Sequence, residues 1–368
     1  MAGLAREAGA VTGDTPNDFA ARLIARIREQ GPISIADYMR ECNAHYYATR
    51  DPFGAAGDFT TAPEISQVFG ELIGAWCADY WQRMGAPDPV LLVELGPGRG
   101  TLMADALRAT RRVPGFHDAL KLHLIEQSPV LRAMQQEKLA AHKPQFHDHI
   151  GTLPTGSMLL IANEFFDALP VVQFERRAGT WRERRIAFDE ATGMLALRAE
   201  SQPNLMGPVL PQAPDGAVLE LLTMSPELDI AIRLRDQGGA ALIVDYGYYP
   251  SQSADTLQAL RQHKPVSIVE SPGDVDLTAH VNFQMIEDRA AGNGAAVYGP
   301  VTQAQFLVAL GIAPREAALL KSASPEQQSA IRSGCRRLIE PAQMGTLFKV
   351  LALAQQGGPV PAGFGAAT

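Results

Sequence analysis

The group of residues in this sequence best suited to chemistry is an acid followed by three closely spaced glycines. The group consists of Glu94, Gly96, Pro97, Gly98 and Gly100, and it directly follows the apolar run 90–93. Glycine has no side chain, so a ligand can press against the backbone there, and a helix that starts after such a turn offers unpaired N–H donors. An acid and a glycine turn at the end of a buried strand predict a nucleotide-type cofactor site.

The spacing of the glycines distinguishes between cofactors. The dinucleotide fingerprint G-x-G-x-x-G would need a glycine where this chain has Thr101, so an NAD-dependent oxidoreductase is disfavoured. The form E-x-G-x-G-x-G instead resembles the pattern of S-adenosylmethionine-dependent methyltransferases, in which the acid reaches toward the methionine ammonium. A second apolar run, 122–125, ends in Glu126, about where a ribose-binding carboxylate belongs. The alternative is an ordinary βαβ unit with Glu126 on its surface.

Polar residues also follow the apolar run 158–162. Because the carboxyl ends of parallel strands meet at one edge of a sheet, we expect Asn163 and Glu164 beside the cofactor. We predict that Glu164 holds a methyl acceptor, that Asn163 orients it through its amide oxygen and also contacts the cofactor, and that Phe165 or Phe166 forms an apolar wall. Asp167 could be catalytic, but capping a helix that starts at residue 168 is the favoured interpretation.

Histidines give weaker signals. His280 could take up a proton near neutral pH, while a structural histidine bonded to a loop carbonyl is at least as good an interpretation. His147 and His149 would share one face of a short strand, but no third ligand lies near them in sequence, so no metal site is predicted.

Three separate motifs give the chain a family resemblance. Residues 57–64 (GDFTTAPE), 96–100 (GPGRG) and 163–170 (NEFFDALP) together resemble the MidA-type methyltransferases, and the likeness runs from about Ile33 to Ala354. That family includes the mitochondrial complex I assembly factor, which methylates an arginine. The resemblance implies a class I methyltransferase fold, S-adenosylmethionine as cofactor, and arginine of a respiratory complex I subunit as acceptor.

The irregular stretch 47–63 is a candidate lid, because loops on a rigid scaffold often carry function. A plain connector is the alternative, and the family, in which this segment closes over the site, favours the lid. Tyr46, Asp58 and Thr61 are the side chains we expect to face the substrate.

The elements that must position these residues alternate between strands and helices. Strands are expected at 90–95, 122–126, 146–150, 158–162, 240–244 and 345–354, which predicts an α/β fold with a Rossmann-like sheet. The expected organisation is a helical cover with the lid at 1–85, a core at 86–170 and 238–356 with a helical insertion at 302–340, a β-hairpin and helix insertion at 171–237, and a disordered tail at 357–368.

Composition narrows the class of protein. The 368 residues carry a net charge of -8, which disfavours nucleic acid as a partner. Three scattered cysteines fit a reducing compartment. With no apolar run long enough for a membrane span and an N-terminus too acidic for a transit peptide, we expect a cytoplasmic protein.

The residues 163–166 also resemble the Asn-Pro-Pro-aromatic loop of amine and amide N-methyltransferases, with Glu164 in place of the first proline. The added negative charge suits a cationic guanidinium better than a neutral amide. We therefore expect methyl transfer to a protein side chain, preferably arginine. The alternatives are an amine, amide or small-molecule N-methyltransferase, and a cofactor-binding assembly chaperone without turnover. A homodimer remains open.

Overall fold

The computed structural model describes residues 16–49, 60–203, 210–261 and 264–365. The helices in this part of the chain are α1 (Pro16–Gln30), α2 (Ile35–Thr49), α3 (Ala62–Ile65), α4 (Gln67–Arg83), α5 (Thr101–Thr110), α6 (Phe116–Ala119), α7 (Pro129–Lys138), α8 (Pro226–Gln237), α9 (Phe283–Gly292), α10 (Gln303–Ala309), α11 (Ile312–Leu320) and α12 (Pro325–Ile339). Short 3-10 turns lie at Ala140–His142 and Ile150–Thr152, and a π-type turn, η4, lies at Pro341–Gly345.

The strands are β1 (Ile33–Ser34), β2 (Val90–Leu95), β3 (Leu120–Ile125), β4 (Gln145–His147), β5 (Met158–Asn163), β6 (Val171–Arg177), β7 (Thr180–Asp189), β8 (Met194–Ala199), β9 (Val218–Leu222), β10 (Gly239–Tyr248), β11 (Gln258–Arg261), β12 (Lys264–Val266), β13 (Asp276–Thr278), β14 (Val281–Asn282), β15 (Ala295–Thr302) and β16 (Phe348–Gln355).

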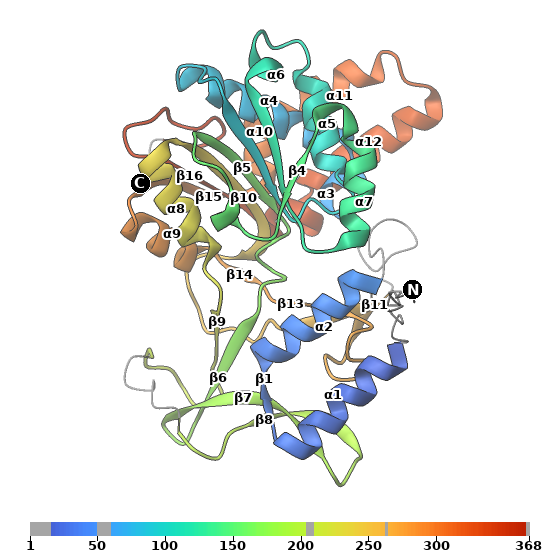
Figure 1. Cartoon of the computed structure of the whole chain (residues 1–368), viewed down its shortest axis with the longest axis vertical. Helices are drawn as coiled ribbons and strands as arrows, with labels where there is room; N and C mark the ends of the chain where they lie inside the picture. The colour runs from blue at the N-terminus through green and yellow to red at the C-terminus, as the bar shows by residue number, and fades with distance from the viewer. Residues whose placement is uncertain (1–15, 50–59, 204–209, 262–263, 366–368) are drawn as a thin grey trace, which may run out of the picture.

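A mixed sheet forms the upper part of the molecule in Figure 1, and its strands run in the order β15-β16-β10-β5-β2-β3-β4. Strands β10, β5, β2, β3 and β4 are parallel, whereas β16 runs antiparallel to both of its neighbours. β2 lies centrally, with β3 on one side and β5 on the other. The strands that follow β2 are therefore added first on one side of it (β3 and β4) and then on the other (β5 and β10). This reversal of strand order opens a crevice at the carboxyl end of β2.

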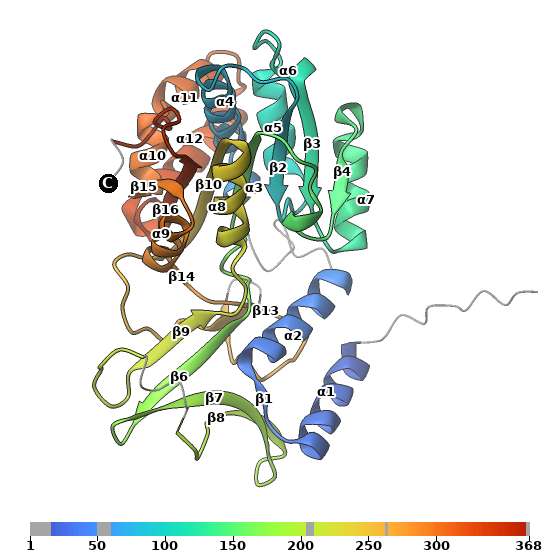
Figure 2. The same ribbon diagram turned by 60° about the vertical axis from the view of Figure 1, so that its left-hand side comes forward.

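Helices cover both faces of this sheet, as Figure 2 shows. Alternate residues of β2 point to opposite faces: Val90 and Leu92 join the core with α4, α5 and α10–α12, while Leu91 and Val93 join the core with α8 and α9. Burial on both sides explains why β2 and β5 read as continuous apolar runs.

A second lobe lies below the sheet in Figure 1. It contains a five-stranded antiparallel sheet (β1, β6, β7, β8 and β9), a small three-stranded sheet (β11–β13), and helices α1 and α2. Leu23, Tyr38, Ile186 and Leu277 belong to its separate apolar core. The buried residues of this second core come from three separate stretches of sequence, 23–42, 171–195 and 259–279.

The domain boundaries expected from sequence differ from those of the structure. Helix α4, assigned above to the N-terminal cover, packs on the main sheet, and so does α8, assigned to the insertion. Conversely β11–β13, assigned to the core, belong to the second lobe with α1 and α2. Amphipathic patterns identify buried faces but not the sheet that each face covers, so sequence continuity was a poor guide here.

The expectation of a disordered tail does not hold for residues 357–365. Trp76 Nε1 donates a hydrogen bond to the Ala362 carbonyl at 3.1 Å, and Phe364 packs against Phe306 with ring centroids 5.3 Å apart. A few anchoring contacts are enough to order a segment rich in glycine and proline.

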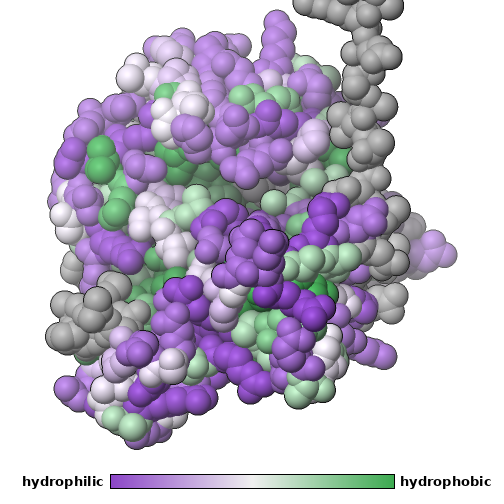
Figure 3. Space-filling view, turned by 60° about the horizontal axis from the view of Figure 1, so that its bottom comes forward, coloured by the Kyte–Doolittle hydropathy of each residue, from purple (hydrophilic) through white to green (hydrophobic). Residues whose placement is uncertain are grey.

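The lower face of the molecule is mostly hydrophilic, and hydrophobic residues emerge there only in separate small patches (Figure 3). Among the residues that the structure describes, no helix combines the length and the apolar character needed to cross a membrane.

Candidate functional site

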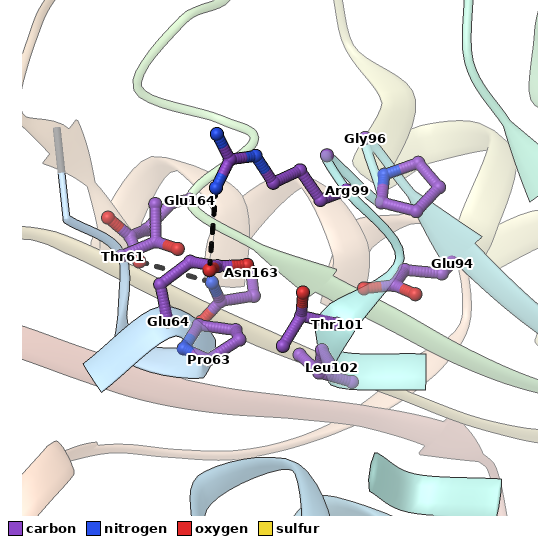
Figure 4. Close-up of a pocket in the computed structure, with 12 residues that line it drawn as sticks. Thr61, Pro63, Glu64, Glu94, Gly96, Arg99, Thr101, Leu102, Asn163 and Glu164 are labelled. Atoms are coloured by element: carbon purple, nitrogen blue, oxygen red, sulfur yellow. Dashed lines mark hydrogen bonds and ion pairs between the residues drawn. The ribbon is translucent and has the colours of Figure 1, made fainter. Parts of the chain in front are cut away.

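A pocket lies at the carboxyl ends of β2 and β5, where the strand order reverses. The space inside it is about 390 Å³, and its lining includes Thr61, Pro63, Glu64, Glu94, Gly96, Pro97, Gly98, Arg99, Thr101, Leu102, Asn163 and Glu164. Figure 4 shows the side chains of β2, α3, α5 and β5 around this space. The glycine turn, the acid of the first strand and the polar end of β5 thus share one pocket.

The glycine turn depends on left-handed backbone conformations. Gly96, Gly98 and Gly100 have φ angles of 58°, 53° and 72°, which residues with a side chain rarely adopt. A Cβ atom at Gly96 would also lie 3.0 Å from the ring of Phe165. Gly100 is the N-cap residue of α5 and makes no side-chain cap, so the first N–H groups of this helix have no capping side chain as partner.

Glu94 is a buried acid in the wall of the pocket. Its side chain is almost fully buried, and its Oε2 atom has no hydrogen-bond partner among the described residues. Burial, followed by the nearby charge of Glu126, raises the pKa of Glu94 to about 8. In Figure 4 this carboxyl group points toward Thr101, at the start of α5.

Glu126 lies next to this turn and is connected to it by a residue that sequence reasoning missed. Gln135 Nε2, on α7, donates to the carbonyl oxygen of Gly98 at 2.7 Å and to Glu126 Oε2 at 3.2 Å. The Ser128 N–H donates to Glu126 Oε1 at 2.8 Å. Burial raises the pKa of Glu126, and these hydrogen bonds oppose that shift. Gln135 reads as an ordinary polar residue of a helix, so only its full burial reveals its position.

Asn163 and Glu164 end β5 inside the pocket. Glu164 has a φ of 50°, a strained value for a residue with a side chain, and its Oε1 accepts from the Ala62 N–H at 3.1 Å and from Asn163 Nδ2 at 3.2 Å. Burial and then the charge of Asp167 raise the pKa of Glu164 to about 7. Asn163 Oδ1 is buried and has no partner within the described ranges.

Asp245, at the end of β10, holds this strained turn. Its Oδ2 atom accepts from the N–H groups of Phe165, Phe166 and Asp167 at 3.1, 2.9 and 3.3 Å. Its Oδ1 accepts from the Tyr246 N–H at 2.9 Å. The residue is completely buried, and burial together with the neighbouring acids raises its pKa. Its sequence position 80 residues downstream gave no sign of this role.

Asp167 does not cap a helix, which corrects the interpretation favoured from sequence. Residues 168–170 form a turn that leads into β6, so no helix follows. The Asp167 carboxyl group instead accepts a hydrogen bond from the Tyr246 hydroxyl, and its Oδ1 has no partner in the part of the chain that the structure describes. Burial is the largest cause that raises its pKa, to about 6.

Several residues expected at the site lie outside the pocket lining. Phe165 is half-buried and lies against Gly96, whereas Phe166 is buried in the core on the α8–α9 face of the sheet. An apolar wall beside the acceptor stays a prediction for Phe165 only. Tyr46 is fully buried in α2. His280 is half-buried against the ring of Tyr246, with centroids 5.3 Å apart. Burial, followed by the charge of Lys349, lowers the pKa of His280.

Of the candidate lid residues, Thr61 does line the pocket. Asp58 lies outside the described residues.

His147 lies in a small cluster of polar side chains outside the pocket lining. His147 faces His123 across β3 and β4, with Nε2 and Nδ1 2.9 Å apart, and its Nδ1 lies 3.1 Å from Thr152 Oγ1. The described residues contain no group of three or more histidines, cysteines or acids that could hold a metal ion.

The pocket fits a ligand rich in hydrogen-bond donors. Glu94 Oε2 and Asn163 Oδ1 are buried acceptors that the described residues leave without partners, and such atoms are rare in native proteins unless something else bonds them. S-adenosylmethionine carries an ammonium group, two ribose hydroxyls and an adenine amine. With the bare glycine backbone beside these acceptors, the pocket has the features of a nucleoside cofactor site in an α/β protein.

Comparison with known proteins identifies the class of enzyme. Residues 72–301 match the family model described as "Putative S-adenosyl-L-methionine-dependent methyltransferase". A mitochondrial protein arginine methyltransferase NDUFAF7 homolog from Drosophila melanogaster is 37% identical, with 91% of this chain and 84% of that protein covered. The Danio rerio NDUFAF7 is 36% identical over 89% of this chain and 84% of its own length.

A crystal structure from Burkholderia thailandensis, bound to S-adenosyl-homocysteine, superposes with a TM-score of 0.80. Its sequence is 27% identical, and the match covers 95% of this chain and 94% of that one. The chain is therefore an S-adenosylmethionine-dependent methyltransferase with a class I fold. It belongs to the MidA-type family of these enzymes.

Proposed function

We propose that this enzyme methylates a guanidinium nitrogen of an arginine in a protein substrate. The observation that carries the proposal is a group of three acids at the acceptor end of β5, namely the half-buried Glu164 and the buried Asp167 and Asp245. No lysine or arginine in the described part of the chain donates a hydrogen bond to any of them, and the pKa of each is raised. The charge of Arg337 acts on Glu164 only through space and does not outweigh the causes that raise its pKa. Acids withdrawn from water without a hydrogen-bonded cation are costly, so the cluster is complementary to a cationic acceptor.

The cofactor end of the pocket has its own assigned roles. When bound, S-adenosylmethionine supplies a methyl group on a positively charged sulfur. We assign Glu94 to the ammonium group, because it presents an unpartnered carboxylate oxygen beside the glycine turn. Glu126 is assigned to the ribose hydroxyls, since two carboxylate oxygens can accept from both. The backbone of Gly96, Pro97, Gly98, Gly100 and Thr101 forms the floor beneath the ligand.

Glu164 and Asn163 would orient the acceptor. An arginine side chain does not deprotonate freely in water, and its nitrogen must lose one N–H proton as the new N–C bond forms. In our proposal Glu164, with a pKa of about 7, starts ionised, holds the guanidinium and takes up that proton. Asn163 accepts from a second guanidinium N–H through Oδ1, and Asp167 stabilises the charge from behind Glu164.

The protein nature of the acceptor is supported by the names of the relatives, which are called protein arginine methyltransferases. We propose a respiratory complex I subunit as the protein that carries the arginine. This part of the proposal rests on the family resemblance and not on the pocket.

Transfer of labelled methyl groups from S-adenosylmethionine to matched peptides tests the proposal. Cell lysate treated with the enzyme first identifies labelled proteins, and mass spectrometry locates the modified residue. Peptides that carry arginine at this position should be labelled, and the same peptides with lysine should not. Labelling confined to lysine or to small molecules would overturn the arginine assignment.

The variant Glu164→Gln separates the enzyme from a cofactor-binding chaperone. It should bind S-adenosyl-homocysteine normally and lose roughly 100-fold or more of its transfer rate, because general acid–base catalysis typically contributes 10²–10⁴-fold. Glu137→Gln, at an exposed position on α7, is the matched control and should transfer normally. A Glu164→Gln enzyme with full activity would contradict the proposed role.

A further inference from the structure

The charges around the pocket are unequal. Its lining carries three acids, Glu64, Glu94 and Glu164, and Arg99 is the only basic residue among the described residues that line it. The cofactor of this family carries both an ammonium group and a carboxylate on its amino-acid end. The ammonium suits the acids, but the carboxylate would be repelled by them unless a cation meets it.

Arg99 belongs to the glycine turn and lies between Gly98 and Gly100. Its Nη1 lies 3.9 Å from Glu64 Oε2, which is an ion-pair distance but too long for a hydrogen bond. Both side chains remain partly exposed, with 28% and 20% of their surface accessible. In Figure 4 the guanidinium extends over the pocket toward Glu64. A long, partly exposed ion pair of this kind contributes little free energy, so a carboxylate that bonds Arg99 directly can compete with Glu64.

The start of α5 adds to the attraction for an anion on the same side. The helix begins at Thr101, directly after Arg99 and Gly100, and no side chain caps it. Helix N-termini carry a partial positive charge and free N–H donors. A carboxylate beside Arg99 would meet this helix end as well as the guanidinium.

We infer that Arg99 recognises the α-carboxylate of the cofactor and that Glu64 is the group it exchanges for that carboxylate. Arginine is suited to this exchange because its planar fork can bind a carboxylate through two parallel hydrogen bonds. Glu64 then acts as an internal competitor. Ligands that lack a carboxylate cannot displace it, so the exchange selects for the complete amino-acid end of the cofactor.

The exchange also connects the two ends of the pocket. Glu64 lies on α3, and the Ala62 N–H of the same helix donates to Glu164. Release of Glu64 from Arg99 adds a further carboxylate to the acids on the acceptor side, where a cationic side chain is expected. The binding part of the inference rests on the cofactor alone and does not depend on the acceptor proposed above.

Isothermal titration with two ligands tests the inference. S-adenosyl-homocysteine has the carboxylate, whereas its decarboxylated analogue keeps the ammonium group and lacks only the carboxylate. Arg99→Gln should weaken binding of S-adenosyl-homocysteine by roughly 10- to 100-fold, the range expected for a charge-assisted hydrogen-bonded pair, and should leave binding of the analogue unchanged. Unchanged binding of the analogue also shows that the variant has folded.

Glu64→Gln gives the second, opposite expectation. Removal of the competitor should strengthen binding of S-adenosyl-homocysteine by a few-fold, again with no change for the analogue. Arg112→Gln, which removes an exposed guanidinium just beyond α5, is the control and should affect neither ligand. The inference is overturned if Arg99→Gln weakens both ligands equally or neither, or if Glu64→Gln weakens binding of S-adenosyl-homocysteine.

Discussion

Two turns at the carboxyl ends of neighbouring parallel strands form the two halves of this active site, and they are built in different ways. The turn after β2 obtains its left-handed backbone from glycines at 96, 98 and 100. The turn after β5 requires the same left-handed conformation of Glu164, a residue with a side chain, and is held by the distant Asp245. The cofactor half is therefore encoded locally, and the acceptor half depends on a tertiary contact. This predicts that mutations far from Glu164 in sequence damage transfer without damaging cofactor binding.

The largest effect that tests the separation of the two halves is expected at Asp245. In Asp245→Asn an amide replaces the carboxylate that accepts several backbone N–H groups, so the turn at Glu164 should shift. We expect single-turnover transfer to fall by about 100-fold, the cost of misplacing a catalytic group by about 1 Å, while calorimetry shows near-normal binding of S-adenosyl-homocysteine. Asp236→Asn, on the exposed end of α8, is the control. A parallel loss of binding and transfer would show that the two halves are not separate.

The reciprocal experiment acts on the cofactor half. Gly96→Ala should lower the free energy of unfolding by about 1 kcal/mol because of its positive φ, and should also weaken binding of S-adenosyl-homocysteine by about 10-fold, since the new methyl group meets Phe165. Gly193→Ala, in the turn between β7 and β8, has a similar φ of 70° but nothing within 4 Å. This control should show only the loss of stability in thermal unfolding. Equal ligand affinity in both variants would contradict the proposal that the glycine turn contacts the cofactor.

The two halves also differ in their pH dependence. The pKa of Glu94 is raised from 4.5 to about 8, so its folded state favours the protonated form. Its contribution to stability is fully present below pH 4.5 and is lost as the pH rises through about 8. For Glu164, whose pKa is raised to about 7, the contribution to stability is lost as the pH rises through about 7. Without ligand, the melting temperature of the native enzyme should therefore fall by a few degrees relative to Glu94→Gln across this range.

Bound S-adenosyl-homocysteine should change the pH dependence due to Glu94 but not the pH dependence due to Glu164. Its ammonium would favour ionised Glu94 and remove the Glu94-dependent fall in melting temperature, while the part that depends on Glu164 should persist. Thermal unfolding of Glu94→Gln and Glu164→Gln, each with and without the ligand, measures both parts. An identical response to the ligand in the two variants would argue against separate partners.

The smallest effect is expected at Ser128, which connects α2 of the second lobe with α7, beside the cofactor half of the site. Its Oγ caps α7 by accepting from the Leu131 N–H and donates to the Tyr47 carbonyl of α2 at 2.8 Å. Ser128→Ala should cost about 1 kcal/mol of unfolding free energy and weaken ligand binding slightly, because the Ser128 N–H at this helix start also donates to Glu126. Ser324→Ala removes a comparable cap from α12, and it should lower stability without changing binding. Denaturant unfolding and calorimetry distinguish the two.

Sequence reasoning succeeded where the signal was local and periodic. The strands β2 and β5 and the glycine turn all follow from apolar runs and from glycine spacing. It was less successful where burial depended on partners from elsewhere. Phe166 became part of the core, Asp167 found a tyrosine instead of a helix to cap, and the tail residues were ordered by Trp76 and Phe306.

The sequence by itself determined the order of strands and helices, the glycine turn and the acids that end β2, β3 and β5. Those features depend on backbone freedom and side-chain polarity within a few residues, which can be read directly. Only the tertiary structure decided that Gln135 connects Glu126 with the turn, that Asp245 holds Glu164, and that Arg99 faces Glu64 across the pocket. These pairings depend on how distant segments are brought together, and the burial and charge of each partner have meaning only once the other is in place.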